Sequence, residues 1–478
     1  MSATSTISSP RRGGAWRLSR CLPALVAAAA VATSAAPALA ADPHDAVYEP
    51  VHTGASPAAS AVRWTRVQPP RPERCEEATP GAPLQSRIDA LPDGAALCLP
   101  PGRYPGTLAV ARPITLWGTP ESVIVSSRVG STVHLTGSGA RLAGFTIDGS
   151  GSRFDIVDAA LKVSAEDVVV EGLVVENATF GILVEKSHRV TVRGNDVVGH
   201  RDVAFGLRGD GIRLWETYDS VVEHNRLTDS RDMVVWYSRG NRVEHNLVVR
   251  GRYGTHFMYS HGNHVVRNRY VDDVVGVFVM YSHGLTIDGN VLAGSGGAAG
   301  MGIGLKESGD IRVTGNALIR DTVGIYIDTS PLDDADHNHF ERNAIRFAGS
   351  AVVFHGRASR NHFTDNSFRD NLAQVECRGG TDAKDAEWNG NDFDDYAGYD
   401  FDGDGYGDVP YELRSMTANL VGHHPGLAFF RGGLALFAVD TVNHVLPLFQ
   451  PSTLLIDPRP RMRSDVGDVE MAGNFDAD

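Results

Sequence analysis

The chain has 478 residues, of which 42% are hydrophobic, so it is long enough to bury a large core. Its formal net charge of −14 argues against nucleic-acid binding, because phosphate recognition needs clustered Lys and Arg. We therefore expect no nucleic-acid partner, and cations or a basic protein fit the charge better.

The first 40 residues are typical of an export signal. Four arginines precede the apolar run 22–32, and the small-residue motif Ala38-Leu39-Ala40 follows it, so we expect 1–40 to be a signal peptide cleaved after Ala40. The next segment, 41–74, is rich in Pro, Ala and Ser and is predicted to be a poorly ordered linker.

The cysteines of the exported chain suggest one disulfide. Cys75 and Cys98 lie close together in the sequence, and we expect a bond between them in an oxidising compartment. Cys377 stands outside this pair. Such a thiol can ligate a metal, but a buried and inert cysteine is commoner.

Residues 75–120 predict an N-terminal cap and a first coil. Leu84, Ile88 and Leu91 have helical spacing, and the Pro-Asp-Gly sequence at 92–94 ends the helix. The segment as a whole resembles the entry cap of right-handed parallel β-helices, in which a short helix covers the open end of the solenoid.

Residues 121–380 carry an internal repeat. Between 219 and 283 three similar segments follow one another, the second and third 22 residues apart. A unit of this size cannot bury its own apolar face, so the repeat predicts a solenoid. The fold class expected is all-β, a right-handed parallel β-helix with three short strands per coil. At ~4.8 Å per coil, roughly eleven coils follow.

A recurrent Asn marks one corner of each coil. Stacked Asn side chains can hydrogen-bond from coil to coil, and Asn also tolerates left-handed backbone angles. The series is Asn195, Asn225, Asn246, Asn268, Asn290, Asn316, Asn343 and Asn366.

The repeated Met-Tyr-Ser-His motif suggests a copper site. Residues 22 apart become neighbours when coils stack, so Met258 should lie beside Met280. Their thioethers and nearby imidazoles are ligands that suit Cu(I). The alternative is that the Met side chains fill the core and the His residues occupy turns, and strand alternation would separate Met258 from His261. The candidate copper ligands are His256, Met258, His261, Met280 and His283.

Residues 381–412 contain an acidic loop of the calcium-binding type. The segment 400–408 has carboxylates at positions 1, 3, 5 and 9 of an EF-hand loop and Gly405 at the sharp turn. Position 12 is Tyr411 rather than Glu, so a structural calcium site is expected; a hydrogen-bonded acidic turn is the alternative. The predicted ligands are Asp400, Asp402, Asp404, the backbone carbonyl of Tyr406, and Asp408.

After the acidic loop the repeat ends. Residues 413–462 are apolar but too interrupted to span a bilayer, and they are equally consistent with a partner-docking extension and a C-terminal cap. Residues 463–478 are predicted to be a disordered tail. We expect the protein to be at most peripheral to a membrane.

A secreted polysaccharide lyase or uronate epimerase is the alternative function. Several carboxylates and one lysine lie on the coils, although the acidic balance disfavours binding of an acidic sugar. These residues are Asp202, Asp210, Glu216, Asp272, Asp273, Lys306, Glu307 and Asp328.

Three features together resemble the NosD family: the exported Asn-laddered coils with Met-Tyr-Ser-His repeats, the run from Trp388 to Tyr411, and the tail with Asp457-Pro-Arg-Pro. The resemblance covers roughly residues 75–462. It implies a periplasmic, non-catalytic accessory protein of an ABC transporter, which works with a copper chaperone lipoprotein in maturing the copper centres of nitrous oxide reductase. The Met and His ligand set is inferred from this sequence and not from the resemblance.

Overall fold

The computed structural model describes residues 64–378, 383–414, 420, 424–430, 433, 434, 438, 442 and 453–463. The expected signal peptide and most of the expected disordered tail lie outside these residues. No helix in the described part of the chain is long and apolar enough to cross a membrane.

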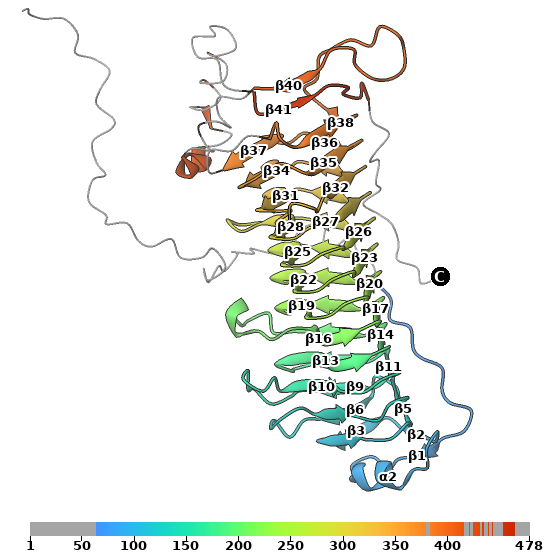
Figure 1. The fold of residues 1–478 in the computed structure, drawn as a ribbon. Helices are drawn as coiled ribbons and strands as arrows, with labels where there is room; N and C mark the ends of the chain where they lie inside the picture. The colour runs from blue at the N-terminus through green and yellow to red at the C-terminus, as the bar shows by residue number, and fades with distance from the viewer. Residues whose placement is uncertain are drawn as a thin grey trace, which may run out of the picture. The chain divides into compact units, whose positions relative to one another are not determined.

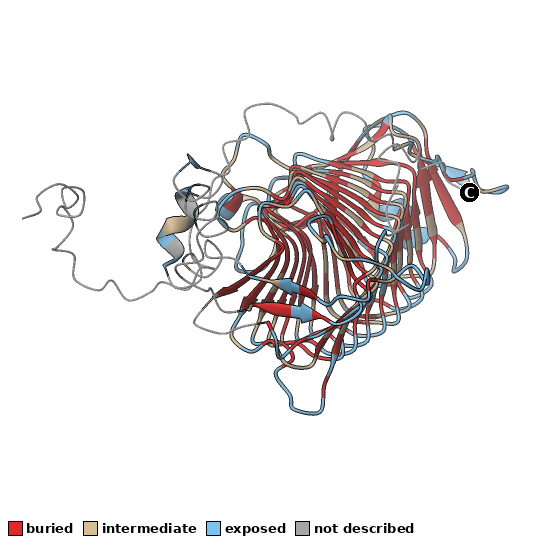
Figure 2. Cartoon of the chain, turned by 90° about the horizontal axis from the view of Figure 1, so that it is seen from above, coloured by how far each residue is buried: buried red, intermediate tan, exposed pale blue. Residues whose placement is uncertain are grey.

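The described chain is a parallel β-solenoid, which confirms the predicted fold class (Figure 1). Each complete coil gives one strand to each of three parallel sheets, here called A, B and C. Seen from above, buried residues recur from coil to coil (Figure 2). Residues that alternate along the strands and face inward, among them Leu285, Ile287 and Val313, are fully buried.

Sheet A has 14 strands. They are β1 (Glu76–Glu77), β2 (Ala96–Leu99), β5 (Thr115–Gly118), β8 (Arg141–Ala143), β11 (Val169–Glu171), β14 (Thr191–Arg193), β17 (Val221–Glu223), β20 (Arg242–Glu244), β23 (His264–Val266), β26 (Thr286–Asp288), β29 (Arg312–Thr314), β32 (Asn338–Glu341), β35 (Asn361–Thr364) and β38 (Glu387–Asn389).

Sheet B has 13 strands. They are β3 (Gly102–Pro105), β6 (Ser122–Val125), β9 (Thr146–Asp148), β12 (Val174–Glu176), β15 (Asp196–Val198), β18 (Arg226–Thr228), β21 (Leu247–Val249), β24 (Arg269–Val271), β27 (Val291–Ala293), β30 (Ala317–Ile319), β33 (Ala344–Arg346), β36 (Ser367–Arg369) and β39 (Asp392–Phe393).

Sheet C has 12 strands. They are β4 (Leu108–Val110), β7 (Val133–Leu135), β10 (Ala159–Val163), β13 (Phe180–His188), β16 (Ile212–Tyr218), β19 (Asp232–Trp236), β22 (Tyr253–Met258), β25 (Val275–Met280), β28 (Met301–Lys306), β31 (Val323–Asp328), β34 (Ser350–His355) and β37 (Val375–Arg378).

The number of coils is larger than the roughly eleven expected. Sheet A alone has 14 strands, because the cap region contributes β1, β2 and β5 and the chain continues to β38 beyond the repeat. The coils of the cap region lack the Asn signature of the repeat, whereas the coil of β38 carries it at Asn391.

The N-terminal end is closed as predicted. The helix α2 (Gln85–Ala90) lies over the first coil, and the neighbouring Leu84 and Leu91 are buried with Ile88 in the main core. A disulfide joins Cys75 to Cys98, which confirms that pairing. Cys377 is buried in the core on β37.

Residues 64–74, which we call the N-terminal strap, run along the solenoid. The Trp64 indole donates to the carbonyl of His224 at 3.0 Å, and the Gln68 amide donates to Gly118 at 2.9 Å. The Trp117 indole in turn donates to the carbonyl of Pro69 at 3.0 Å. The expectation of a poorly ordered linker is therefore wrong for these residues, because side-chain hydrogen bonds fix them to coils at β5 and β17.

The predicted Asn series forms a continuous buried ladder between sheets A and B. Each side-chain amide donates to the amide oxygen of the next Asn at 2.9–3.0 Å. The left-handed angles, however, belong to the residue before each Asn, such as His224 with φ 54° and His245 with φ 54°. The Asn itself turns inward, where its amide satisfies buried backbone groups.

The ladder ends in the C-terminal segment. Asn391 extends the series, and its backbone and side-chain amides both donate to Asp457 at 3.0 and 2.9 Å. Asp457 lies on β41 (Leu455–Asp457), which pairs antiparallel with β40 (Tyr411–Leu413). The described residues 453–463 therefore cap the solenoid. The rest of the expected extension includes the 3-10 helix η2 (Pro425–Phe430) and lies largely outside the described residues.

We expect Asn268→Ala to lower the free energy of unfolding by about 3 kcal/mol or more, because each buried polar group left unsatisfied costs about 1–3 kcal/mol. Asn268 is fully buried, donates to Val243 and Asn290, and accepts from Asn246. Urea unfolding monitored by circular dichroism measures the loss. Asn389→Ala, on the exposed side of β38, is the control, and an equal effect of both substitutions would contradict the ladder's role.

Candidate metal and partner site

The Met-Tyr-Ser-His strands lie side by side in sheet C. Trp236, Met258 and Met280 are register partners on β19, β22 and β25. The residues before them, including Phe257 and Val279, are fully buried in the core. Alternation along a strand therefore places the two Met side chains on the outer face of the sheet. The alternative that they fill the core therefore holds in part: Met280 is buried, but in an apolar cluster outside sheet C and not in the inner core.

The outer face of sheet C carries a second apolar cluster, which we call the outer cluster. Its buried members come from β25, the residue before it, and η1 (Phe205–Leu207), a 3-10 turn in the loop after β15. The outer cluster consists of Phe205, Val274, Val275, Phe278 and Met280, with Tyr253, Met258, Tyr281, Ala299 and Met301 packed against them. An apolar cluster outside a sheet excludes water from the polar groups inside it.

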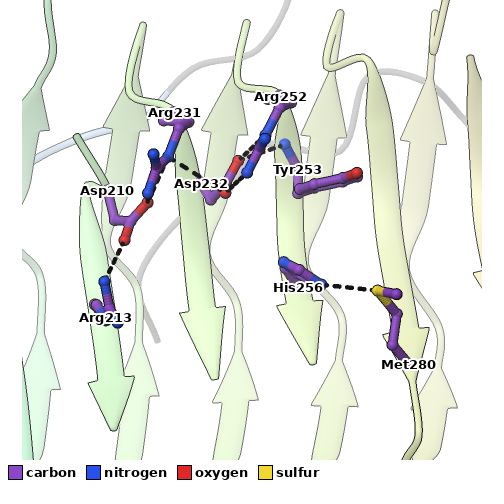
Figure 3. Close-up of polar contacts among 8 residues, drawn as sticks. All are labelled: Asp210, Arg213, Arg231, Asp232, Arg252, Tyr253, His256 and Met280. Carbon is purple, nitrogen blue, oxygen red and sulfur yellow. Dashed lines mark hydrogen bonds and ion pairs between the residues drawn. The ribbon is translucent and has the colours of Figure 1, made fainter. Parts of the chain in front are cut away.

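His256 lies within this apolar environment and faces Met280. Its Nε2 is 3.3 Å from the Met280 Sδ, and only 6% of His256 is exposed (Figure 3). The rings of Tyr253 and Trp236 lie 4.7 and 5.4 Å from the imidazole, centroid to centroid. The structure therefore brings an imidazole nitrogen and a thioether sulfur together in a mostly buried pair, with Met258 on the same strand as His256 and in register with Met280.

His261 and His283 lie elsewhere. Tyr259 and Tyr281 have φ values of 50° and 49°, so the chain turns immediately after β22 and β25. This turn carries both histidines into the corner between sheets C and A. Burial lowers the pKa of His261, and the nearby His283 lowers it further. The five expected copper ligands are thus divided between a sheet face and a corner, because the strand does not continue to His261.

A stack of aromatic rings follows the same corner. Tyr237, Tyr259 and Tyr281 stack at centroid distances of 5.5 and 5.0 Å, and Trp215 lies 5.0 Å from Tyr237. Tyr237 and Tyr259 are 40% and 44% exposed. The repeat predicts the Tyr neighbours, but Trp215 belongs to a coil outside the three similar segments and was missed. Exposed aromatic stacks of this kind are suited to contact with a partner.

Two buried ion pairs support the strand that carries His256. Asp210 accepts from Arg231 at 2.8 Å, and Asp232 accepts from Arg252 at 3.0 Å (Figure 3). Burial raises the pKa of Asp210, although Arg231 opposes the shift. Asp232 also accepts from the backbone of Tyr253, so the pair of Asp232 with Arg252 fixes the start of β22.

The carboxylates considered for sugar chemistry include two with clear structural roles. Asp210 belongs to the ion pairs above. Asp273 is buried, and its Oδ1 accepts from the backbone of Gly251 at 2.6 Å, which closes the corner between sheets B and C. Burial raises the pKa of Asp273 well above its usual range.

Three of the four carboxylates in the acidic loop 400–408 lie close together. The ligand atoms of Asp400, Asp402 and Asp408 lie within 4.8 Å of one another. Asp404 instead pairs with Arg459 at 2.7 Å, and this hydrogen bond lowers the pKa of Asp404. The arrangement fits a cation held by three carboxylates, with Asp404 used to attach the loop to the C-terminal cap.

The chain is similar in sequence to proteins of one known family. Residues 199–401 match the family described as NosD, periplasmic copper-binding protein. A Pseudomonas aeruginosa protein named probable ABC transporter binding protein NosD is 30% identical over 403 residues, covering 79% of this chain and 91% of that protein. A protein of the same name from Stutzerimonas stutzeri is 27% identical over 387 residues, covering 76% and 86%.

Solved structures with a similar fold have lower sequence identity to this chain. The A-module of the mannuronan C-5 epimerase AlgE6 from Azotobacter vinelandii has a TM-score of 0.43 and 15% identity, covering 66% of this chain and 95% of that one. A PL6 alginate lyase in complex with a trisaccharide has a TM-score of 0.49 and 12% identity, covering 68% and 86%.

Proposed function

This chain belongs to the NosD family of periplasmic copper-binding proteins, and we propose that it carries a Cu(I) ion on the outer face of sheet C. The observation that supports this most directly is the pairing of His256 Nε2 with Met280 Sδ at 3.3 Å. Copper is here the cargo of the protein. The role is that of a non-catalytic accessory protein in the periplasm.

The donor set suits Cu(I) rather than a harder ion. Imidazole nitrogen and thioether sulfur are borderline and soft ligands, which Cu(I) prefers over carboxylate oxygen. Met258 lies beside Met280 as its register partner and supplies a third donor. The surrounding outer cluster lowers the local dielectric and excludes water, so a monovalent ion bound to neutral ligands is favoured over a more strongly hydrated dication.

The names of the relatives support a transporter partner, and the other partners are part of the proposal. The relatives are named as probable ABC transporter binding proteins, and we propose that this chain likewise acts with an ABC transporter permease. In this proposal a copper chaperone lipoprotein supplies the ion, and the copper centres of nitrous oxide reductase receive it. The exposed aromatic stack beside the Cu(I) site offers a contact surface for either protein.

The transporter contact is assigned to the segment between β40 and β41. Phe430, Leu434 and Val442 are 51%, 88% and 54% exposed. Exposed large apolar side chains are typical of a surface that a partner covers. The cap formed by 453–463 and this docking segment then have separate roles, although the sequence suggested only one or the other.

A structural calcium ion is the remaining part of the proposal. Three convergent carboxylates from Asp400, Asp402 and Asp408 supply the oxygen ligands that Ca²⁺ prefers. The loop is joined to the cap through Arg459, so an ion here would stiffen the C-terminal end of the solenoid.

Substituting His256→Phe together with Met280→Leu should weaken Cu(I) binding by at least about tenfold, because removing direct ligands costs no less than the 10–100-fold seen for residues that orient ligands. Both substitutions keep the site apolar and filled. Anaerobic competition against a chromophoric Cu(I) chelator measures the affinity. The variant His261→Ala with His283→Ala is the control and should retain binding; equal affinity of the wild type and the His256/Met280 variant would exclude this site.

Replacing residues 415–452 by a short Gly-Ser turn should abolish co-purification with the permease while the solenoid stays folded. The replacement is possible because Leu413 and Leu455 are paired neighbours on β40 and β41. A pull-down with the membrane-embedded transporter measures binding, and the thermal melting curve checks the fold. Retained binding would move the docking surface to the solenoid itself.

Saturating Ca²⁺ should raise the melting temperature of the full chain, since a ligand at 100 times its Kd stabilises by about 2.7 kcal/mol. Asp402→Asn should remove most of this response, and the exposed Asp385→Asn should not. Differential scanning calorimetry with Ca²⁺, Mg²⁺ or chelator makes the comparison. A Ca²⁺ response that survives Asp402→Asn would show that the loop is only a hydrogen-bonded turn.

A further inference from the structure

We propose that His283, Asp310 and Asp336 form a second metal site, which takes a divalent ion of borderline softness such as Zn²⁺. This site lies at the corner between sheets C and A and is separate from the proposed Cu(I) site on the face of sheet C. It goes beyond the proposed function, because neither the ion nor its ligands are those of the copper cargo.

The distances between the three side chains suit one small ion. The His283 Nε2 lies 3.1 Å from Asp336 Oδ1 and 3.3 Å from Asp310 Oδ2, and the three ligand atoms lie within 4.8 Å of one another. Zn²⁺ holds nitrogen and oxygen at about 2.0–2.2 Å, so two of its tetrahedral ligands are separated by about 3.3–3.5 Å. The donors need little movement to share an ion.

Coil stacking and one inserted loop bring these residues together. The backbone of His283 pairs with Gly309 on the next coil, which sets Asp310 beside it. Asp336 comes from the loop 329–337 between β31 and β32, which folds back over the same corner. No repeat spacing relates Asp336 to the other two residues, so only the folded chain shows the cluster.

Both carboxylates are held in place by contacts other than His283. The backbone amide of His337 donates to Asp310 Oδ1 at 3.0 Å, which directs Oδ2 toward the imidazole. Asp336 is 9% exposed and packs directly over Gly309. A Cβ at position 309 would lie 1.9 Å from Asp336 Oδ2, so only glycine allows this approach. Such support fixes ligand orientation before an ion binds.

The chemistry of the donors distinguishes this site from the Met and His pair. One neutral imidazole and two carboxylates carry two negative charges, which balance a dication. Carboxylate oxygen with imidazole nitrogen is a set that Zn²⁺ binds well, and it lacks the soft sulfur that Cu(I) requires. The side chains of His283 and Asp310 are 51% and 48% exposed, so an ion has access from solvent and a water can fill the fourth position.

The ordinary alternative is an ion pair between a protonated His283 and the two carboxylates. In that case the cluster has no specific affinity for a metal. A second alternative is that Zn²⁺ prefers the nearby His337 and His362, whose Nδ1 and Nε2 lie 2.7 Å apart. The experiment must therefore separate three outcomes.

Isothermal titration of the full exported chain with Zn²⁺ at pH 7 should show one site that weakens by at least about 10–100-fold in His283→Gln, in Asp310→Asn and in Asp336→Asn. Asp333→Asn, in the same loop, and His264→Ala, an exposed histidine on β23, are the matched controls and should bind as the wild type does. The His256→Phe with Met280→Leu variant should also keep its Zn²⁺ site, so a failure of the copper proposal is seen separately.

Three results would overturn the proposal. Wild-type protein that binds no Zn²⁺ would leave an ion pair, as would unchanged affinity in the His283 and Asp310 variants. Loss of Zn²⁺ binding in His362→Ala with full binding in His283→Gln would move the site to the histidine pair. Thermal melting of each variant in the presence of chelator confirms that the solenoid is folded, and the three single variants make the test independent of any one that fails to fold.

Discussion

The hydrogen-bonded Asn ladder is the constraint on which the other features of this protein depend. In a parallel stack of short strands, a slip of one residue would exchange the inner and outer faces of a coil. The ladder prevents that slip. Each buried amide, such as that of Asn268, must meet the next Asn and a backbone carbonyl of the preceding coil, and a shifted coil would leave those groups unsatisfied.

Because the register is fixed, residues one repeat apart in the sequence lie side by side on adjacent coils. It places Met258 beside Met280 and brings His256 on one strand to the sulfur of the next. The register is the same in every sheet of the coil. Residues only a few positions apart in the sequence can therefore form two different sites, one on the outer face of a sheet and one at its corner. Residues with a left-handed backbone conformation, such as Tyr259 and Tyr281, separate the sheet face from the corner. The soft donors then remain among apolar side chains, and His283 is carried to a corner lined with carboxylates.

The two proposed metal sites therefore differ in environment as well as in ligands. The sheet-face pair is mostly buried and neutral, which favours a weakly hydrated monovalent ion. The corner cluster is half exposed and carries two carboxylates, which favours a dication. In an acidic chain with a formal net charge of −14, both kinds of cation are attracted at long range, so selectivity has to come from the donors themselves.

The sequence alone predicts most of what repeats or is local. Its period and Asn series specified the parallel coils, helical spacing specified the cap around Ile88, and the proximity of Cys75 and Cys98 specified the disulfide. Tertiary structure alone decided what depends on contacts without a period: Asp457 ending the ladder, Trp64 strapping the coils, and Asp336 reaching His283. The physical reason is that a period fixes only which residues stack on adjacent coils. The contacts of an inserted loop or of a terminal segment depend on where the assembled coils leave space and unsatisfied polar groups. Those positions exist only in the folded chain.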